Sequence, residues 1–345
     1  MSRRIGFVTT SWPSEKRPWA GHFIAGLAEA LVGAGVTVEV VAPCFDDDLA
    51  LVVPEGILVR PARVAGRRGK QLSRDWTAWL RVITSLRRVA KSVDVDFWFA
   101  HWWPSVLALG RARRVAIVLH GSDMDLLERL PGSVARFLHR RGRILAVAPG
   151  LASRFARTHK RLARNPAVVP LGAKSPESFE DLPAFAAQWA TEKVPRLLTI
   201  ARPSPGKGLD VARTIAASNE HYAYLVAGEP AIAPATARCL MKHADLCIVP
   251  SRQDASLPSE GRPHVIVQAL VAGVPCVGGP NHAVRQAMRE FGQLECTEDG
   301  PDALTRAIEK ALEPQCYGRL QSRARELGDL LQWHIAVKHW LAHIP

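Results

Sequence analysis

A strand, a helix and a second strand can be recognised in residues 5–42, IGFVTTSWPSEKRPWAGHFIAGLAEALVGAGVTVEVVA. The apolar runs 5–10 and 37–42 are short and rich in β-branched residues, which predicts two buried strands. Between them, apolar residues recur at helical spacing from Gly21 to Val32, and the glycines that follow end the predicted helix. This order predicts a parallel sheet with helices on both faces.

Further strands are predicted over residues 95–100, 115–119, 143–147 and 167–170. A polar, proline-containing stretch then precedes a second series, with strands predicted at 196–200, 223–226, 246–249 and 275–277 and helices at 209–217 and 263–271. The alternation predicts two doubly wound α/β lobes joined near residues 172–190. The last segment, 302–344, has helical periodicity and carries Trp333 and Trp340, which favours packing of this segment against another surface.

Composition limits the class of protein. The chain has 345 residues, of which 48% are apolar and 22% charged, and a formal net charge of +13. These values exclude a disordered, collagen-like or coiled-coil protein, and at about 150 residues per domain the length predicts two domains. No uncharged apolar run reaches the roughly 18 to 20 residues of a spanning helix, so we expect no transmembrane segment. The positive charge favours an anionic partner, and by itself leaves nucleic acid, anionic lipid and a phosphorylated substrate open.

The cysteines and the N-terminus indicate a compartment. The six cysteines have no CxxC spacing, so we expect reduced, buried thiols rather than a zinc site or a redox motif. The first apolar stretch is too short for a secretory signal peptide. A cytoplasmic location is therefore the expectation.

Candidate sites lie in the loops beyond the carboxyl ends of the strands, where open parallel sheets bind ligands. Gly21 allows either a close approach to a ligand or only a tight turn. His101 and His120 each follow a strand and could bond a hydroxyl or a phosphate, although for His101 an ordinary packed histidine is the favoured alternative. Asp123 could cap the next helix or bind a hydroxyl.

A basic loop lies in the second lobe. Residues 201–208, ARPSPGKG, follow a strand and precede a helix, and both Arg202 and Lys207 could converge on a diphosphate. The loop lacks the Walker pattern, because Lys207 is followed by glycine rather than by Ser or Thr. A solvated basic loop is the alternative.

A further candidate lies in residues 259–270, SEGRPHVIVQAL. Glu260 precedes a helix that is predicted to start near Pro263, so a carboxylate for sugar hydroxyls and free amides for a phosphate would be adjacent. Gln268 lies nearly two turns further along that helix, on the face shared with His264. A simple helix cap is the alternative.

Taken in order, these segments resemble glycosyltransferase family 4, a group of retaining, nucleotide-sugar-dependent enzymes with the GT-B fold. The matching segments are IGFVTTSWP…AGHFIAGLAEAL, HWWPS, HGSD, VVPLGA, ARPSPGKG, ADLCIVPS and SEGRPHVIVQALVAGVPCV. They follow the family's order over almost the whole chain. The Arg-x4-Lys spacing and the EGxP-helix-AxGxP block are the most specific of them.

The resemblance implies two Rossmann-like lobes that face a cleft. Residues 1–172 would bind the acceptor, residues 173–325 would bind the nucleotide sugar, and a helix in 326–345 would return to the first domain. A sugar would move from a nucleoside-diphosphate sugar with retention, without a metal ion or other cofactor, and with UDP or GDP as the favoured nucleotide. The leaving phosphate would take the acceptor's proton, so no side-chain nucleophile is expected.

The resemblance also implies residue roles. Arg202 and Lys207 would neutralise the leaving diphosphate, Glu260 would hold hydroxyls of the donor sugar, and His120 would lie beside the reacting sugar. These four residues are the catalytic candidates. The substrate-binding candidates are Gly21, His22, His101, Asp123, Ser251, Gly261, Arg262, Pro263, His264, Val265 and Gln268.

Three departures from the family's pattern concern the donor. Gln268 replaces the family's second glutamate, so a charge-assisted bond to the ribose is lost. Ala20 and Ala201 replace glycines in two turns. The segment 228–244 is shorter than in the family, where it helps to enclose the base.

Three functions remain open. The favoured one is transfer to a small soluble acceptor in specialised-metabolite biosynthesis, with no nucleic-acid partner. The second is a peripheral enzyme at the inner membrane face that acts on an anionic lipid, because residues 60–91 interleave many basic residues with Trp76, Trp79, Leu80, Val82 and Ile83. The third is a non-catalytic homologue that binds nucleotide sugars, against which the presence of all four catalytic candidates argues.

Overall fold

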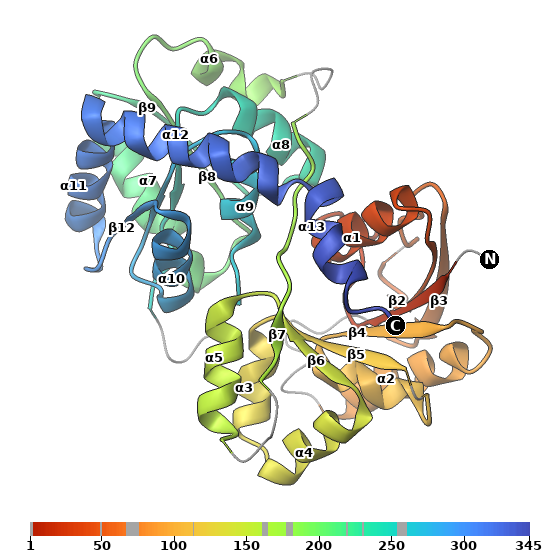
Figure 1. Ribbon diagram of the computed structural model, residues 1–345. Helices are drawn as coiled ribbons and strands as arrows, with labels where there is room; N and C mark the ends of the chain where they lie inside the picture. Colours follow the sequence, from red (N-terminus) through yellow and green to blue (C-terminus); the bar gives the residue numbers. More distant parts are fainter. Residues whose placement is uncertain are drawn as a thin grey trace. The chain divides into compact units, whose positions relative to one another are not determined.

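The computed structural model describes residues 3–48, 50–66, 76–112, 114–160, 165–176, 182–218, 220–229, 231–253 and 261–345. The chain divides into two compact units (Figure 1). Unit 1 comprises residues 1–171 and 336–345, and unit 2 comprises residues 172–335. Each unit is built on one parallel sheet, as the sequence predicts.

Unit 1 contains a seven-stranded parallel sheet in the order β3-β2-β1-β4-β5-β6-β7. Its strands are β1 (Arg4–Thr9), β2 (Thr37–Phe45), β3 (Ile57–Val64), β4 (Phe97–His101), β5 (Val115–Leu119), β6 (Arg143–Ala146) and β7 (Ala167–Val168). Its helices are α1 (His22–Gly33), α2 (Trp76–Ala90), α3 (Ser122–Glu128), α4 (Gly132–Arg141) and α5 (Pro149–Thr158), together with a 3-10 helix over Trp103–Leu109. Helices α1 and α2 lie on opposite faces of the sheet (Figure 1).

The strand order of unit 1 places the first strand in the interior of the sheet. β1 pairs with β2 on one side and with β4 on the other. Its residues from Ile5 to Thr9 are all buried, as in a strand that is covered on both faces. Phe7 and Phe99 are buried and meet edge to face, with ring centroids 5.6 Å apart. The carboxyl ends of β1, β4 and β5 therefore lie next to one another at one edge of a rigid sheet.

Unit 2 contains a five-stranded parallel sheet in the order β12-β11-β10-β8-β9. Its strands are β8 (Arg196–Ile200), β9 (Ala223–Ala227), β10 (Leu246–Val249), β11 (Cys276–Gly278) and β12 (Leu294–Glu295). Its helices are α6 (Ala187–Ala190), α7 (Leu209–Ser218), α8 (Pro234–His243), α9 (His264–Val271), α10 (His282–Phe291), α11 (Pro301–Leu312) and α12 (Pro314–Leu331), with 3-10 turns at Ala184–Ala186 and Pro205–Lys207.

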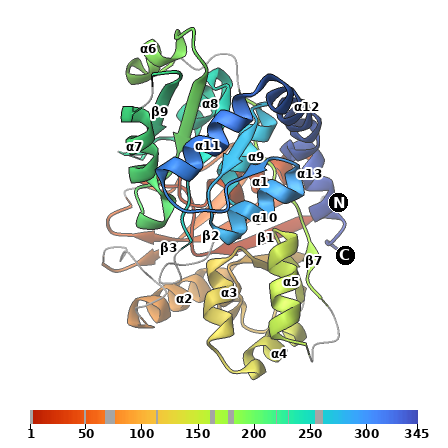
Figure 2. The same ribbon diagram turned by 90° about the vertical axis from the view of Figure 1, so that its left-hand side faces the viewer.

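Successive strand residues of unit 2 enter two separate cores. Leu197 packs with residues of α7 and α11, while its neighbour Leu198 packs with residues of α8, α9 and α10. In β10, Leu246 likewise belongs to the core that contains Leu197, and Cys247 to the core that contains Leu198. This alternation is the period of two of a strand that is buried on both faces. Figure 2 shows α7 and α11 on the side of unit 2 that faces the viewer.

The C-terminal helix α13 (Trp333–Leu341) crosses the boundary between the two units. Trp333 belongs to unit 2, where its ring covers Gly172, whereas Trp340 belongs to unit 1 and donates from Nε1 to the carbonyl of Pro170 at 2.8 Å. Both tryptophans are buried. The two side chains thus anchor one helix to two different units. Within the described part of the chain, no helix is both long and apolar enough to cross a bilayer.

Candidate functional site

Two histidines meet at the carboxyl edge of the sheet in unit 1. His101 is the last residue of β4 and His120 follows the last residue of β5, the neighbouring parallel strand. Nδ1 of His101 lies 3.1 Å from Nε2 of His120, and the rings stack with centroids 5.3 Å apart and an interplanar angle of 27°. The structure therefore brings together two residues that were separate candidates in the sequence.

The histidine pair is held in an aromatic environment. The ring centroid of His101 lies 4.7 Å from that of Phe7 and 6.1 Å from that of Trp340. The ring centroid of Phe23, on α1, lies 5.2 Å from that of His120. Burial lowers the pKa of His120 to about 3 and the pKa of His101 well below its ordinary value, with the neighbouring His120 as a second cause. Both imidazoles are therefore neutral at pH 7.

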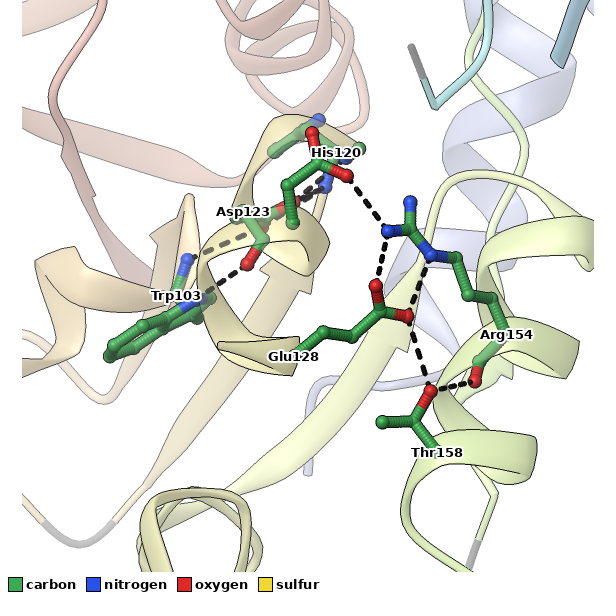
Figure 3. Close-up of polar contacts among 8 residues, drawn as sticks. Trp103, His120, Asp123, Glu128, Arg154 and Thr158 are labelled. Atoms are coloured by element: carbon green, nitrogen blue, oxygen red, sulfur yellow. Dashed lines mark hydrogen bonds and ion pairs between the residues drawn. The ribbon is translucent and has the colours of Figure 1, made fainter. Parts of the chain in front are cut away.

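The Asp123 carboxylate organises the loop that carries His120. It is fully buried and accepts from the backbone N–H of Gly121 at 2.8 Å and from that of His120 at 3.0 Å (Figure 3). A longer bond of 3.4 Å comes from the backbone N–H of Trp103. Burial raises the pKa of this carboxyl to about 6, while the backbone hydrogen bonds act in the opposite direction. The carboxylate therefore holds the loop before α3, and a bond of Asp123 to a substrate hydroxyl remains a prediction.

An ion-pair network ties the same loop to a neighbouring helix. Arg154 of α5 donates to both carboxylate oxygens of Glu128 and, at 2.8 Å, to Asp125, and both carboxylates belong to α3 (Figure 3). Thr158 adds a hydrogen bond to Glu128 at 3.1 Å. The Arg154 guanidinium holds the pKa of Glu128 below its usual range. Since α3 begins directly after His120 and Gly121, this network fixes the helix that positions the histidine.

The start of α1 is set by chain geometry. Gly21 has a φ of 63°, and a Cβ atom at this position would lie 2.3 Å from the carbonyl oxygen of Ser11. Only glycine fits, so the tight turn alone explains this residue. His22, the first helical residue, pairs its Nδ1 with the carbonyl of Trp19 at 3.0 Å. Contacts of Gly21 and His22 with a substrate remain predictions.

Two cations follow β8 in unit 2. Arg202 is exposed and Lys207 is half-buried at the end of a 3-10 turn, Pro205–Lys207. Burial and the charge of Arg202 lower the pKa of Lys207 to about 8. Gly208 then adopts a φ of 65°, and a Cβ atom there would lie 2.1 Å from the carbonyl oxygen of Pro250. The basic loop is thus pressed against the end of β10, and its two positive charges repel each other.

Ser251 lies at the same edge of the sheet of unit 2, two residues beyond β10. Its side chain is buried, and its carbonyl accepts from the N–H of Asn281 at 3.1 Å. Arg252 next to it binds back to the basic loop, from its N–H to the carbonyl of Gly206 at 3.0 Å and from its guanidinium to Asp210 at 2.7 Å. The three loops after β8, β10 and β11 are therefore joined by their own hydrogen bonds.

Helix α9 begins where the sequence predicts, with Pro263 at its N-cap. His264 pairs its Nε2 with the carbonyl of Gly172 at 2.8 Å, Val265 packs on the core, and Gln268 is half-buried. Gly261 forms a bend before the helix. Glu260, a catalytic candidate, lies outside the described residues.

Arg262 forms a largely buried ion pair inside unit 2. Only 8% of the residue is exposed, and its Nη2 lies 2.7 and 2.8 Å from the two carboxylate oxygens of Glu290 on α10. Its guanidinium also lies 4.9 Å from the ring centroid of Phe291. These contacts hold the start of α9 to α10, and a contact of Arg262 with the donor remains a prediction.

The described residues contain no group of three or more His, Cys, Asp or Glu side chains that could hold a metal ion. The metal-independent reaction implied by the resemblance stays a prediction. The cationic groups at the edge of unit 2 offer charge neutralisation without such an ion.

Comparison with known proteins places this geometry in a family. Residues 20–174 match the model described as Glycosyltransferase Family 4. Over these residues the chain is similar to the glycosyltransferases of family 4. The chain has the two-sheet architecture of the GT-B fold, as the sequence predicts. No curated protein matches the sequence significantly.

Solved structures resemble this chain over nearly their whole length. A trehalose-phosphate synthase from Burkholderia xenovorans in complex with glucose-6-phosphate has a TM-score of 0.73 at 14% identity, with 99% of each chain covered. The E. coli trehalose-6-phosphate structure bound with UDP-2-fluoro glucose has a TM-score of 0.69 at 13% identity, covering 99% of this chain and 98% of the other. WaaG, a glycosyltransferase involved in lipopolysaccharide biosynthesis, has a TM-score of 0.63 at 11% identity, with 99% of each chain covered. At these identities the likeness shows the fold.

Several residues that shape the candidate site were not found from the sequence. Phe23 packs on His120, and Arg154 fixes α3 from a distant segment. Trp102, just after β4, has a φ of 70°, the one positive value among described residues other than glycine. The strand assignment alone could have indicated the histidine pair, because β4 and β5 are consecutive strands whose carboxyl ends meet at one edge.

Proposed function

We propose that this glycosyltransferase transfers a sugar from a nucleoside-diphosphate sugar to a small soluble acceptor, with retention of configuration at the anomeric carbon. The observation that carries the proposal is the pair of cations after β8. Arg202 offers a planar fork of donors, Lys207 a point charge, and both belong to one loop at the edge of the sheet. A diphosphate is the ligand whose chemistry matches this pair.

The electrostatics of the basic loop support an anionic ligand. Lys207 loses affinity for its proton because it is partly buried beside another cation. A bound diphosphate would remove that cost by supplying negative charge to both groups. The same charges would then stabilise the diphosphate as it leaves, which is where charge develops in the reaction.

The proposed reaction needs no protein nucleophile. The bond between the anomeric carbon and the diphosphate oxygen breaks, and the acceptor oxygen bonds to the anomeric carbon on the same face. The acceptor's proton passes to the leaving phosphate oxygen, and the products are the glycoside and the nucleoside diphosphate. We assign to His120 a hydrogen bond to a substrate hydroxyl, and to Glu260 and Gln268 contacts with hydroxyls of the donor.

The similar structures support a sugar-nucleotide donor, because one of them is bound with UDP-2-fluoro glucose. UDP and GDP are our favoured nucleotides. All six cysteines are free, in keeping with our proposal of a cytoplasmic enzyme.

Helix α2 supports a small acceptor over a lipid. Two of the apolar residues that could have entered a bilayer, Val82 and Ile83, are buried in unit 1, and so is the neighbouring Leu86. Leu80 is 54% exposed, and the basic residues Arg81, Arg87, Arg88 and Lys91 are exposed with it. This face can attract anionic lipid electrostatically but offers little apolar area for insertion. An anionic lipid acceptor is the second candidate, because the similar structure WaaG is involved in lipopolysaccharide biosynthesis.

A nucleotide screen tests the proposal. We expect one or more of UDP, GDP, ADP and TDP to raise the melting temperature by mass action, and the corresponding sugar nucleotides to release nucleoside diphosphate in the presence of acceptors. No stabilisation by any of the four nucleotides contradicts the proposal. Stabilisation without turnover supports a non-catalytic homologue instead, and salt-sensitive sedimentation with anionic vesicles supports the lipid acceptor.

A further inference from the structure

The histidine pair of unit 1 has one polar atom left on each ring. The bond between Nδ1 of His101 and Nε2 of His120 uses one nitrogen of each imidazole. The other two, Nε2 of His101 and Nδ1 of His120, are buried and have no hydrogen-bond partner among the described residues. Buried polar atoms are normally paired, so an unpaired one calls for a ligand or another explanation.

The two unpaired atoms differ in what could reach them. His101 is 1% exposed, and its ring is packed against Phe7, Phe99 and Trp340. His120 is only half-buried and lies in a loop at the carboxyl edge of the sheet. Although Nδ1 of His120 is itself buried, His120 is the more exposed ring of the pair, so a ligand can approach the pair only through His120.

We propose that His101 is a positioning residue, which orients the ring of His120 and fixes its tautomer so that Nδ1 of His120 donates a hydrogen bond to a substrate hydroxyl. The proposal deepens the proposed function, on which it rests. It changes the role of His101 from a substrate contact to a residue that acts through its neighbour.

The tautomer follows from the burial of His101. Both rings are neutral, so one proton lies on the bond between them. If His120 donated this proton, His101 would carry a second proton on Nε2, as a buried N–H with no acceptor. If His101 donates from Nδ1, its Nε2 holds only a lone pair, and His120 carries its proton on Nδ1. Each arrangement leaves one N–H without a partner among the described residues. The second places this N–H on His120, the ring that a substrate hydroxyl can approach, and leaves only a lone pair on the inaccessible His101.

Nuclear magnetic resonance of the intact protein tests this arrangement directly. Long-range correlation of ¹⁵N and ring protons in ¹⁵N-histidine-labelled protein at pH 7 distinguishes the two neutral tautomers. The variants His101→Asn and His120→Gln assign the signals. We expect both histidines to carry their proton on Nδ1. A proton on Nε2 of His120, or a mixture of its two tautomers, overturns the proposal.

Two substitutions of His101 separate the hydrogen bond from the packing. His101→Phe keeps an aromatic ring and removes the donor, and we expect His120 to become a mixture of tautomers and kcat/KM to fall about tenfold, the value of one hydrogen bond. His101→Asn loses the ring but places an amide N–H near the position of Nδ1. We expect it to restore the Nδ1 tautomer of His120 and to recover most of kcat/KM.

Ser105→Ala is the matched control for loss of stability. The Ser105 hydroxyl is buried and donates to the carbonyl of His101 at 2.9 Å, but it does not touch either imidazole. We expect a lower melting temperature with unchanged His120 signals and kcat/KM. Equal kinetic losses in Ser105→Ala and His101→Phe, or wild-type signals in His101→Phe, overturn the proposal. A wild-type protein without turnover contradicts the proposed function, while the tautomer measurement still decides the positioning.

Discussion

Nη2 of Arg262 lies 2.7 and 2.8 Å from the two carboxylate oxygens of Glu290, and this ion pair joins the segment that leads into α9 to the end of α10. The Arg262 side chain is almost fully buried, whereas that of Glu290 is partly exposed. A buried guanidinium without its counter-charge is costly, so the pair is a structural element of unit 2.

Glu290→Gln tests this role. We expect the free energy of unfolding to fall by about 2 kcal/mol, because the substitution leaves the Arg262 charge buried without an anion. Glu326→Gln is the control, since its pair with Arg323 is exposed on both sides and should contribute less than about 1 kcal/mol. Urea denaturation of both variants gives the comparison, and equal losses would show that the burial of Arg262 has no energetic effect.

The pKa of Lys207 predicts how nucleotide binding depends on pH. The folded-state pKa is lowered to about 8, so Lys207 loses its proton as the pH rises through 8, and with it the attraction for a diphosphate. Between pH 7.5 and 9 the protonated fraction of the free protein falls roughly tenfold, and affinity should fall by a similar factor. Titration calorimetry with the nucleotide that stabilises the protein measures this dependence.

Lys207→Arg is the control for that titration. Arginine keeps its charge over the whole range, so the variant should bind with an affinity that changes little between pH 7.5 and 9. The same pH dependence in Lys207→Arg as in the wild type would place its origin in another group.

Much of the fold could be predicted from local patterns. The strands β5, β8 and β10 have the predicted bounds, because a short β-branched run between polar residues is distinctive. β3 was missed, since it contains Pro61 and two arginines, Arg60 and Arg63. It is an edge strand, paired on one side only, where a proline and charged side chains are tolerated.

Contacts between side chains could be predicted less well from the sequence. The position of Arg262 near a helix start suggested a contact with the nucleotide-sugar donor. Its partner in the structure is Glu290, which lies 28 residues away, and nothing in the local sequence indicates this pair. Trp333 and Trp340 share a helical period but belong to different units, a distinction set by tertiary packing. Asp123 was recognised as a candidate from local sequence, and its carboxylate accepts from the backbone N–H of Gly121, two residues before it.

Asp123→Asn tests how the buried carboxyl group of Asp123 affects stability. The folded-state pKa is raised to about 6 from an ordinary 3.8, so the folded protein binds this proton more tightly than the unfolded chain. The resulting stabilisation is fully present below pH 3.8 and is lost as the pH rises through 6. The stability of the wild type relative to Asp123→Asn should therefore fall by about 2 kcal/mol between pH 4.5 and 7. Urea denaturation across this range measures it, and a relative stability that rises with pH contradicts the assignment.

Gly208→Ala tests the packing of the basic loop. A Cβ atom would meet the carbonyl of Pro250, and the positive φ adds strain, so we expect a loss of about 2 kcal/mol or more in unfolding free energy and weaker nucleotide binding. Gly300→Ala is the control, because Gly300 also has a positive φ but no atom within 4 Å of the place that an added methyl group would occupy. Calorimetric unfolding should show a smaller loss for Gly300→Ala and no change in its nucleotide affinity.

In the proposed function the cation at position 207 binds the diphosphate of the donor, and a nucleotide titration of Lys207→Ala measures this contact. Lys242→Ala is the charge-matched control, since Lys242 is exposed at the end of α8, which leads into the opposite edge of the sheet. We expect Lys207→Ala to remain folded and to bind the stabilising nucleotide at least about tenfold more weakly, with transfer lost, while Lys242→Ala behaves as the wild type. Unchanged affinity and turnover in Lys207→Ala, or equal losses in the two variants, would contradict the account.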